Sequence, residues 1–249
     1  MPSSSAESEG PPTGGLPLFP LGTVLFPGLV LPLAVFEERY RALVRDVTAG
    51  AGDGPREFGV VAIERGWEVD RHDDFWVGRA VPGRPTDSAA LSLHEVGCSA
   101  EIRQITEHAD GRFDLVTVGR RRFQILRVET RAGPYLTAEV RFLAEAEGAP
   151  GEADRLVPGL LELFQRYLRL LRPDQVGEQV PDEAAILSHL IAATVALPLP
   201  ERQALLAAPD IASRLRAERR LLHREVTLLH RVRALPVPLP EFAVASSPN

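Results

Sequence analysis

The stretch LPLFPLGTVLFPGLVLPLAVFEERY, residues 16–40, determines how the first part of this chain folds. It overlaps a segment, 10–36, that carries no charged residue and is long enough to cross a membrane as a helix. Prolines interrupt that segment at Pro17, Pro20, Pro27 and Pro32. Because each proline removes a helical hydrogen bond, we expect no membrane-spanning helix here. The short apolar runs between the prolines instead predict β-strands at sheet edges, bends or bulges.

The region 15–145 continues in the same way, with one helix and further short strands. The helix is predicted from an apolar face made of Phe36, Tyr40, Leu43, Val44 and Val47. Strands are predicted at 58–63, 75–80, 98–107, 113–118, 123–128 and 135–143. Asp110-Gly111 is a good hairpin turn because both residues tolerate positive φ. Hairpin-linked strands at this spacing predict an antiparallel, partly closed sheet.

The region 146–235 is patterned as helices. A stripe of leucines ends at Pro173, Asp182 is placed to cap a second helix, and a short helix begins near Pro200. Asp210 is placed to cap a long last helix. The two ends, 1–14 and 236–249, are predicted to be disordered tails. The predicted fold class is therefore α+β, a sheet subdomain followed by a helical subdomain.

The composition excludes several kinds of enzyme. All 28 basic residues are arginine, so the chain has neither a Walker A loop nor a Ser–Lys dyad, both of which need lysine. The single cysteine, Cys98, excludes an internal disulfide and a multi-cysteine metal site, and its flanks predict a buried thiol in a strand. The net charge of -6 argues against a general polyanion binder. We expect no catalytic residue and no cofactor.

Three histidine-containing stretches are candidates for a metal site. His94-Glu95 lacks a second histidine at i+4, and His223 and His230 are two helical turns apart, too far to chelate one ion together. His72-Asp73-Asp74 is typical of a turn, with surface metal binding as the alternative. The sequence therefore predicts no metal site.

One cationic cluster, Arg120-Arg121-Arg122, follows Gly119 at a predicted hairpin end. A solvated turn with acidic partners accounts for it. The alternative is contact with phosphate, with Phe123 as a platform for base stacking, which would make the protein an RNA binder. That alternative requires the three arginines to form one unpaired, contiguous face.

The quoted stretch resembles the opening of Lon protease N-terminal domains. The shared features are Leu16-Pro17-Leu18-Phe19-Pro20-Leu21, Val24-Leu25-Phe26-Pro27-Gly28, Leu31-Pro32-Leu33 and Phe36-Glu37-x-Arg39-Tyr40. The segment from Gly111 to Phe123 is similar to the central hairpin of that family. The helical end is also similar, at Leu197, Arg202-Gln203, Leu205-Leu206, Asp210-Ile211 and Arg214-Leu215. The resemblance covers about 15–235, with both ends in the right order.

This resemblance implies a PUA-like β-barrel followed by a helical bundle. In full Lon enzymes the domain recognises substrates, while separate modules hydrolyse ATP and cleave peptide bonds. Because this sequence ends where those modules would begin, it resembles the free-standing Lon-domain proteins of bacteria. The resemblance supplies no catalytic residues, and we expect a cytoplasmic, non-enzymatic module that binds unfolded polypeptide or a partner protein. A proteolysis adaptor or a chaperone-like factor would fit.

The candidate peptide-binding residues lie in and beside the quoted stretch. Peptide binding requires exposed apolar surface and a few directional groups, and proline-punctuated edge strands offer unpaired backbone groups for an added strand. We expect a groove near Phe26, Phe36, Arg39 and Tyr40. The competing interpretation is that Phe36 and Tyr40 are only the buried face of the predicted helix.

Overall fold

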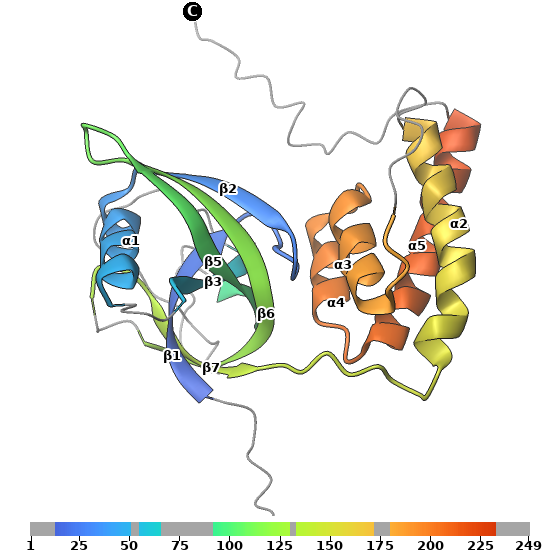
Figure 1. Ribbon diagram of the computed structural model, residues 1–249, viewed down its shortest axis with the longest axis horizontal. Helices are drawn as coiled ribbons and strands as arrows, with labels where there is room; N and C mark the ends of the chain where they lie inside the picture. Colours follow the sequence, from blue (N-terminus) through green and yellow to red (C-terminus); the bar gives the residue numbers. More distant parts are fainter. Residues whose placement is uncertain (1–12, 51–54, 66–91, 130–132, 172–179, 233–249) are drawn as a thin grey trace, which may run out of the picture. The chain divides into compact units, whose positions relative to one another are not determined.

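The computed structural model describes residues 13–50, 55–65, 92–129, 133–171 and 180–232 (Figure 1). The chain divides between Ala144 and Glu145 into two compact units, a sheet unit and a helical unit. The α+β fold class is confirmed. The predicted strand at 75–80 and most of both predicted tails lie outside the described residues. Thr13 and Gly14, which the sequence predicts in the first tail, begin the first strand.

The sheet unit contains seven described strands: β1 (Thr13–Leu21), β2 (Val30–Val35), β3 (Glu57–Arg65), β4 (Ser92–Leu93), β5 (Val96–Glu107), β6 (Phe113–Glu129) and β7 (Thr137–Phe142). They follow the order β1-β7-β6-β5-β3-β4, and β1 also pairs with β3, so the sheet closes on itself. The closing pair is parallel and the other pairings are antiparallel, as predicted for most of the sheet. β2 lies off this path and pairs with β6 (Figure 1).

The interior of the closed sheet is filled by apolar side chains at alternating strand positions, because successive residues of a strand point to opposite faces. Leu16 and Leu18 of β1 belong to this core, together with Phe123 of β6. A Cβ on Gly59 would lie 2.8 Å from the ring of Phe123, and one on Gly97 would lie 2.4 Å from it. Glycine at these two positions therefore makes room for the largest core side chain.

Helix α1 (Glu38–Gly50) packs onto the sheet unit through Tyr40, Leu43 and Val44, which are buried. The Tyr40 ring stacks on Phe19, with 4.1 Å between ring centroids. The Tyr135 hydroxyl donates to the Asp46 carboxylate over 2.8 Å, and partial burial with this contact raises the pKa of Tyr135 to about 12. The helix begins two residues after Phe36, so the prediction that Phe36 belongs to its apolar face is wrong.

The expected strands 113–118 and 123–128 are one continuous strand, β6, with no hairpin end at Arg120–Arg122. The sequence predicts a turn where Gly119 is followed by three arginines, and this prediction is wrong. The structure gives another reason for this glycine. A Cβ there would lie 2.2 Å from the carbonyl oxygen of Phe26, so Gly119 permits a close approach of two backbones in mid-strand.

The helical unit contains α2 (Glu152–Leu171), α3 (Ala184–Thr194), α4 (Leu199–Leu206) and α5 (Ile211–Val232). α2 and α5 lie side by side and parallel, since Arg216 pairs with Glu152 near their N-terminal ends and Arg166 contacts His230 near their C-terminal ends (Figure 1). Apolar side chains of α2, α3 and α5 form the core cluster, which includes leucines of each of these helices together with Phe164 and Tyr167.

Two predicted caps had different outcomes. Asp210 caps α5 as predicted, because its Oδ1 accepts a hydrogen bond from the Ser213 amide over 2.7 Å, which lowers the pKa of Asp210. Asp182 does not cap α3, whose N-cap is Glu183 without a side-chain hydrogen bond. Among the helices described, none has the length and apolarity that a membrane crossing requires.

Candidate functional site

The outward face of β2 is apolar. Val30, Pro32 and Ala34 are exposed, whereas the intervening residues are partly covered and Val35 is buried. Phe36 follows in the same alternation, and 65% of it is exposed, as is 61% of Val30. A strand with one solvated face normally carries polar residues there. We call these four residues, Val30, Pro32, Ala34 and Phe36, the β2 row.

A shallow hollow of about 430 Å³ lies beside the β2 row. It is lined by Pro32, Leu33, Ala34, Gln104, Thr106, Asp114, Leu115 and Val116. The strand register explains this grouping, because Ala34, Asp114 and Thr106 are direct neighbours across β2, β6 and β5. A smaller hollow of about 150 Å³ continues from it toward Phe36 and the β5–β6 hairpin, sharing Ala34 and Asp114.

β2 is also an edge strand, since among the described strands it pairs with β6 alone. The Gly119 amide donates to the Leu29 carbonyl over 2.9 Å, and the Thr117 hydroxyl donates to the Leu31 carbonyl over 2.8 Å. Within β2, the odd-numbered residues therefore direct their backbone groups toward β6. In an antiparallel ladder the even-numbered residues then direct theirs to the open edge. Pro32 has no N–H to leave unpaired there, as is typical of proline in an edge strand.

The four residues expected to form a groove do not share one surface. Phe26 and Tyr40 are buried in the core of the sheet unit, so neither is placed to contact a ligand directly. Arg39 is partly exposed, and its guanidinium lies 2.6 Å from Glu37 and 4.8 Å from the Tyr40 ring centroid. Phe36 is exposed, at the end of the β2 row.

Of the β2 row, sequence reasoning named Phe36 alone and missed Val30, Pro32 and Ala34, as well as the polar residues that line the hollow, Gln104, Thr106 and Asp114. A signal for the row was present, because apolar residues occur at 30, 32, 34 and 36 in the quoted stretch. The alternate residues 31, 33 and 35 are apolar too. The alternation that reveals the outward face of a strand was therefore absent from the sequence.

The charges around the hollow are few and mostly paired. Asp114 lies 2.7 Å from the imidazole of His108. At the hairpin tip, Arg112 is engaged by Asp110 over 2.7 Å, and the backbone N–H and guanidinium of Arg112 lower the pKa of Asp110. Asp114 is thus the acidic group that lines both hollows, and the guanidinium of Arg112 already pairs with the Asp110 carboxylate.

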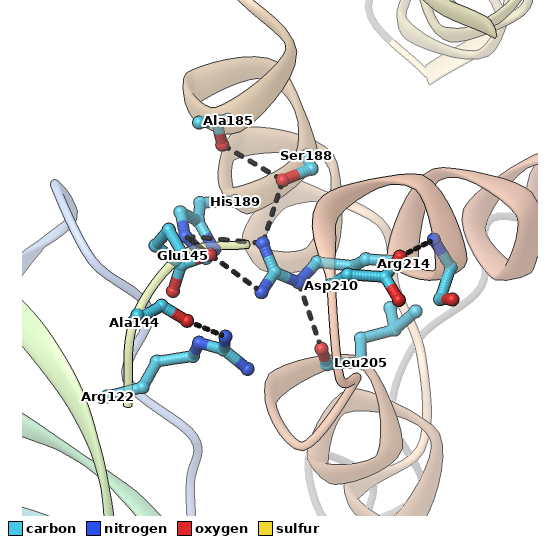
Figure 2. A network of polar contacts seen from close by, with 10 residues as sticks. Arg122, Ala144, Glu145, Ala185, Ser188, His189, Leu205, Asp210 and Arg214 are labelled. Carbon is cyan, nitrogen blue, oxygen red and sulfur yellow. Dashed lines mark hydrogen bonds and ion pairs between the residues drawn. The ribbon is translucent and has the colours of Figure 1, made fainter. Parts of the chain in front are cut away.

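The arginine cluster does not form a cationic face. Arg120 pairs with Glu101 over 3.0 Å, and Arg121 lies 3.3 Å from Glu57. Arg122 is buried and donates to the Ala144 carbonyl over 3.3 Å (Figure 2). Phe123 is also buried, so no stacking platform exists at that position. The RNA-binding alternative has no support in this geometry.

The histidines and the cysteine of the described residues were the other candidates for chemistry. Within the described ranges, no three His, Cys, Asp or Glu side chains are grouped closely enough to hold a metal ion. His72-Asp73-Asp74 lies outside those ranges. Cys98 is buried in β5, as predicted.

The helical unit contains a buried polar network around Arg214 (Figure 2). Arg214 is completely buried, and its guanidinium donates to the Leu205 carbonyl, the Ser188 hydroxyl oxygen and the Glu145 carboxylate over 3.0 to 3.1 Å. His189 Nε2 lies 3.3 Å from the same guanidinium. The Ser188 hydroxyl donates to the Ala185 carbonyl over 2.9 Å. Because that proton is directed at a carbonyl oxygen, the arrangement is suited to folding rather than to nucleophilic catalysis.

Comparison with known families decides what kind of protein this is. Residues 15–224 match the ATP-dependent protease La (LON) substrate-binding domain. The chain belongs to this family. It is 28% identical over 219 residues to Lon protease 2 of Herpetosiphon aurantiacus and 30% identical over 220 residues to Lon protease 2 of Myxococcus xanthus. Each match covers 86% of this chain and 24% of the relative, so the chain spans about a quarter of the length of these LON relatives.

Solved structures of LON N-terminal domains are also similar. The N-terminal domain of the Mycobacterium avium complex Lon protease matches with a TM-score of 0.61 at 21% identity, covering 86% of this chain and 98% of that one. A Lon N-terminal domain protein from Xanthomonas campestris matches with a TM-score of 0.50 at 26% identity, covering 84% and 98%. The LON resemblance inferred from the quoted stretch is confirmed.

Proposed function

We propose that this chain is a non-catalytic module that binds unfolded polypeptide through the β2 row and the hollow beside it. The observation that carries the proposal is the apolar outward face of β2, with Val30 and Phe36 largely exposed. Contiguous exposed apolar surface on a soluble protein is typical of an interaction site. An unfolded chain presents the apolar side chains that such a surface can cover.

The energetics favour a modest, reversible interaction. Covering Phe36 and Val30 contributes on the order of 1.5–3 kcal/mol each for full burial, before the cost of ordering the bound segment. The hollow is shallow and carries only three polar side chains, Gln104, Thr106 and Asp114, so it imposes few directional demands. Low selectivity with moderate affinity is what a receptor for many unfolded chains requires.

The family description, a substrate-binding domain, supports polypeptide as the ligand class. The proteolytic activity named for the relatives belongs to proteins of which this chain spans about a quarter. The finer role that fits is a cytoplasmic proteolysis adaptor or chaperone-like factor, which holds unfolded chains and leaves cleavage to another component.

The test is a fluorescence titration of a reduced, alkylated, permanently unfolded protein with wild type, Phe36→Ser and Leu126→Ser. Leu126 is the matched control, because it is an exposed residue of β6, 43% accessible, that does not line the hollow. We expect Phe36→Ser to weaken binding about tenfold and Leu126→Ser to leave it unchanged, with stability changed by less than about 0.5 kcal/mol in both.

Absence of binding by the wild type would refute the proposal. Equal losses in the two variants would refute the assignment of the site to the β2 row, since they would indicate a general surface effect.

A further inference from the structure

The open edge of β2 presents backbone groups in a fixed pattern. Val30 and Ala34 each direct an N–H and a C=O away from β6, and Pro32 directs only a C=O. Among the described strands none covers this edge. We propose that the bound polypeptide adds to this edge as an extended strand, and that a basic residue opposite Ala34 is preferred. This inference rests on the proposed function and specifies its geometry and the class of segment bound.

Strand addition satisfies the backbone and the side chains of this site together. An extended segment supplies N–H groups at every second residue, which match the carbonyls of Val30, Pro32 and Ala34. Alternate side chains of that segment then lie in line with the β2 row. Because the row is apolar, apolar residues at those positions extend a continuous covered surface.

The basic preference follows from the neighbours of Ala34 across the sheet. Ala34 lies next to Asp114 of β6, and Asp114 lies next to Thr106 of β5. Neighbouring strands are about 4.8 Å apart, so a residue opposite Ala34 is about 10 Å from the Asp114 backbone. A long lysine or arginine side chain can cross the small Ala34 and reach the exposed carboxylate. An acidic side chain at the same place meets the like charge of Asp114, whose carboxylate lies 2.7 Å from the His108 imidazole, while the guanidinium of Arg112 is engaged by Asp110.

The test uses a short synthetic peptide with valine at alternate positions and a lysine at the centre. Each backbone amide is N-methylated in turn, which removes one donor and leaves every side chain in place. We expect affinity losses with a period of two, about tenfold at the positions that donate to β2 and small at those between. A flat profile with the parent peptide still bound would overturn strand addition and leave the proposed function intact. Failure of the parent peptide to bind would overturn both.

Two variants of Ala34 test the protein side of the same bonds. Ala34→Pro removes an edge N–H, and the same strand already accommodates Pro32 in the equivalent orientation. Ala34→Val adds similar bulk and keeps the N–H. We expect about tenfold weaker binding for Ala34→Pro and a much smaller change for Ala34→Val, with near-ultraviolet circular dichroism unchanged in both. Equal losses would mean that the shape of residue 34 matters and its N–H does not.

Asp114→Asn tests the charge preference. Wild type is expected to bind the lysine peptide several-fold more tightly than the matched glutamate peptide, and Asp114→Asn is expected to remove that difference. Equal affinity of wild type for the two peptides would overturn the basic preference.

Discussion

The most exposed large apolar side chains lie in the sheet unit, whereas most of the buried ionisable side chains lie in the helical unit. The sheet unit places apolar side chains outside, at Val30 and Phe36. The helical unit places ionisable side chains inside, at Arg214 and Glu218. An exposed apolar face contributes little to the fold of its own unit and offers surface to a partner. A buried charge contributes to one specific packing and is inaccessible to ligands.

The two units also differ in how far their arginine contacts are exposed to solvent. In the sheet unit, Arg122 is buried, but the half-exposed Arg120 and Arg121 pair with Glu101 and Glu57, and solvent weakens what such pairs contribute to stability. In the helical unit, Arg214 joins three other segments of the unit, through Glu145, Ser188 and Leu205. We infer that substitutions should affect binding in the sheet unit and stability in the helical unit.

The largest effect is expected from Arg214→Met. The change leaves the Leu205 carbonyl, the Ser188 hydroxyl and the Glu145 carboxylate without their buried donor, and removal of one partner of a buried charged network typically costs about 3–5 kcal/mol. Urea denaturation followed by circular dichroism measures the loss. Arg216→Met, which removes the more exposed ion pair with Glu152, is the matched control and should cost less than about 1 kcal/mol. Similar losses in the two variants would contradict the distinction between buried and exposed charges.

A smaller, pH-dependent effect is expected from Glu218→Gln. Among the described residues neither carboxylate oxygen of Glu218 has a hydrogen-bond partner, and burial raises its pKa well above the ordinary 4.5. The folded state therefore retains a proton that the unfolded state loses as the pH rises above 4.5, so this group's stabilisation is greatest below pH 4.5 and is lost as the pH rises to the folded pKa.

Glutamine does not titrate, so the free energy of unfolding of Glu218→Gln relative to wild type should increase with pH. The slope is about 1.4 kcal/mol per pH unit between the two pKa values, measured by urea denaturation from pH 5 to pH 7. Parallel pH profiles for variant and wild type would show that Glu218 does not titrate differently in the two states.

Much of the fold could be predicted from the sequence because its local signals agree with its tertiary structure. Asp210 caps α5, and the proline-rich opening forms β1 and β2. The continuity of β6 could not be predicted, since Gly119 looks like a turn residue until the approach of the Phe26 backbone is known. Phe36 has helical spacing to Tyr40, yet the helix starts at Glu38.

The candidate site was harder to predict than the fold. β2 is apolar on both faces, so its composition does not show which residues face outward. The register of its pairing with β6 decides that. The role of Arg214 depends on partners far away in sequence, at Glu145 and Ser188. Such long-range contacts leave no local periodicity to detect.

The contrast between the two units is tested most directly by amide hydrogen exchange with and without saturating unfolded polypeptide. We expect the amides of Val30 and Ala34, which face the open edge, to exchange more slowly in the complex. Those of Leu31 and Leu33, which face β6, should change little, and so should the core of the helical unit. Protection confined to the helical unit, or absent from β2, would contradict the account.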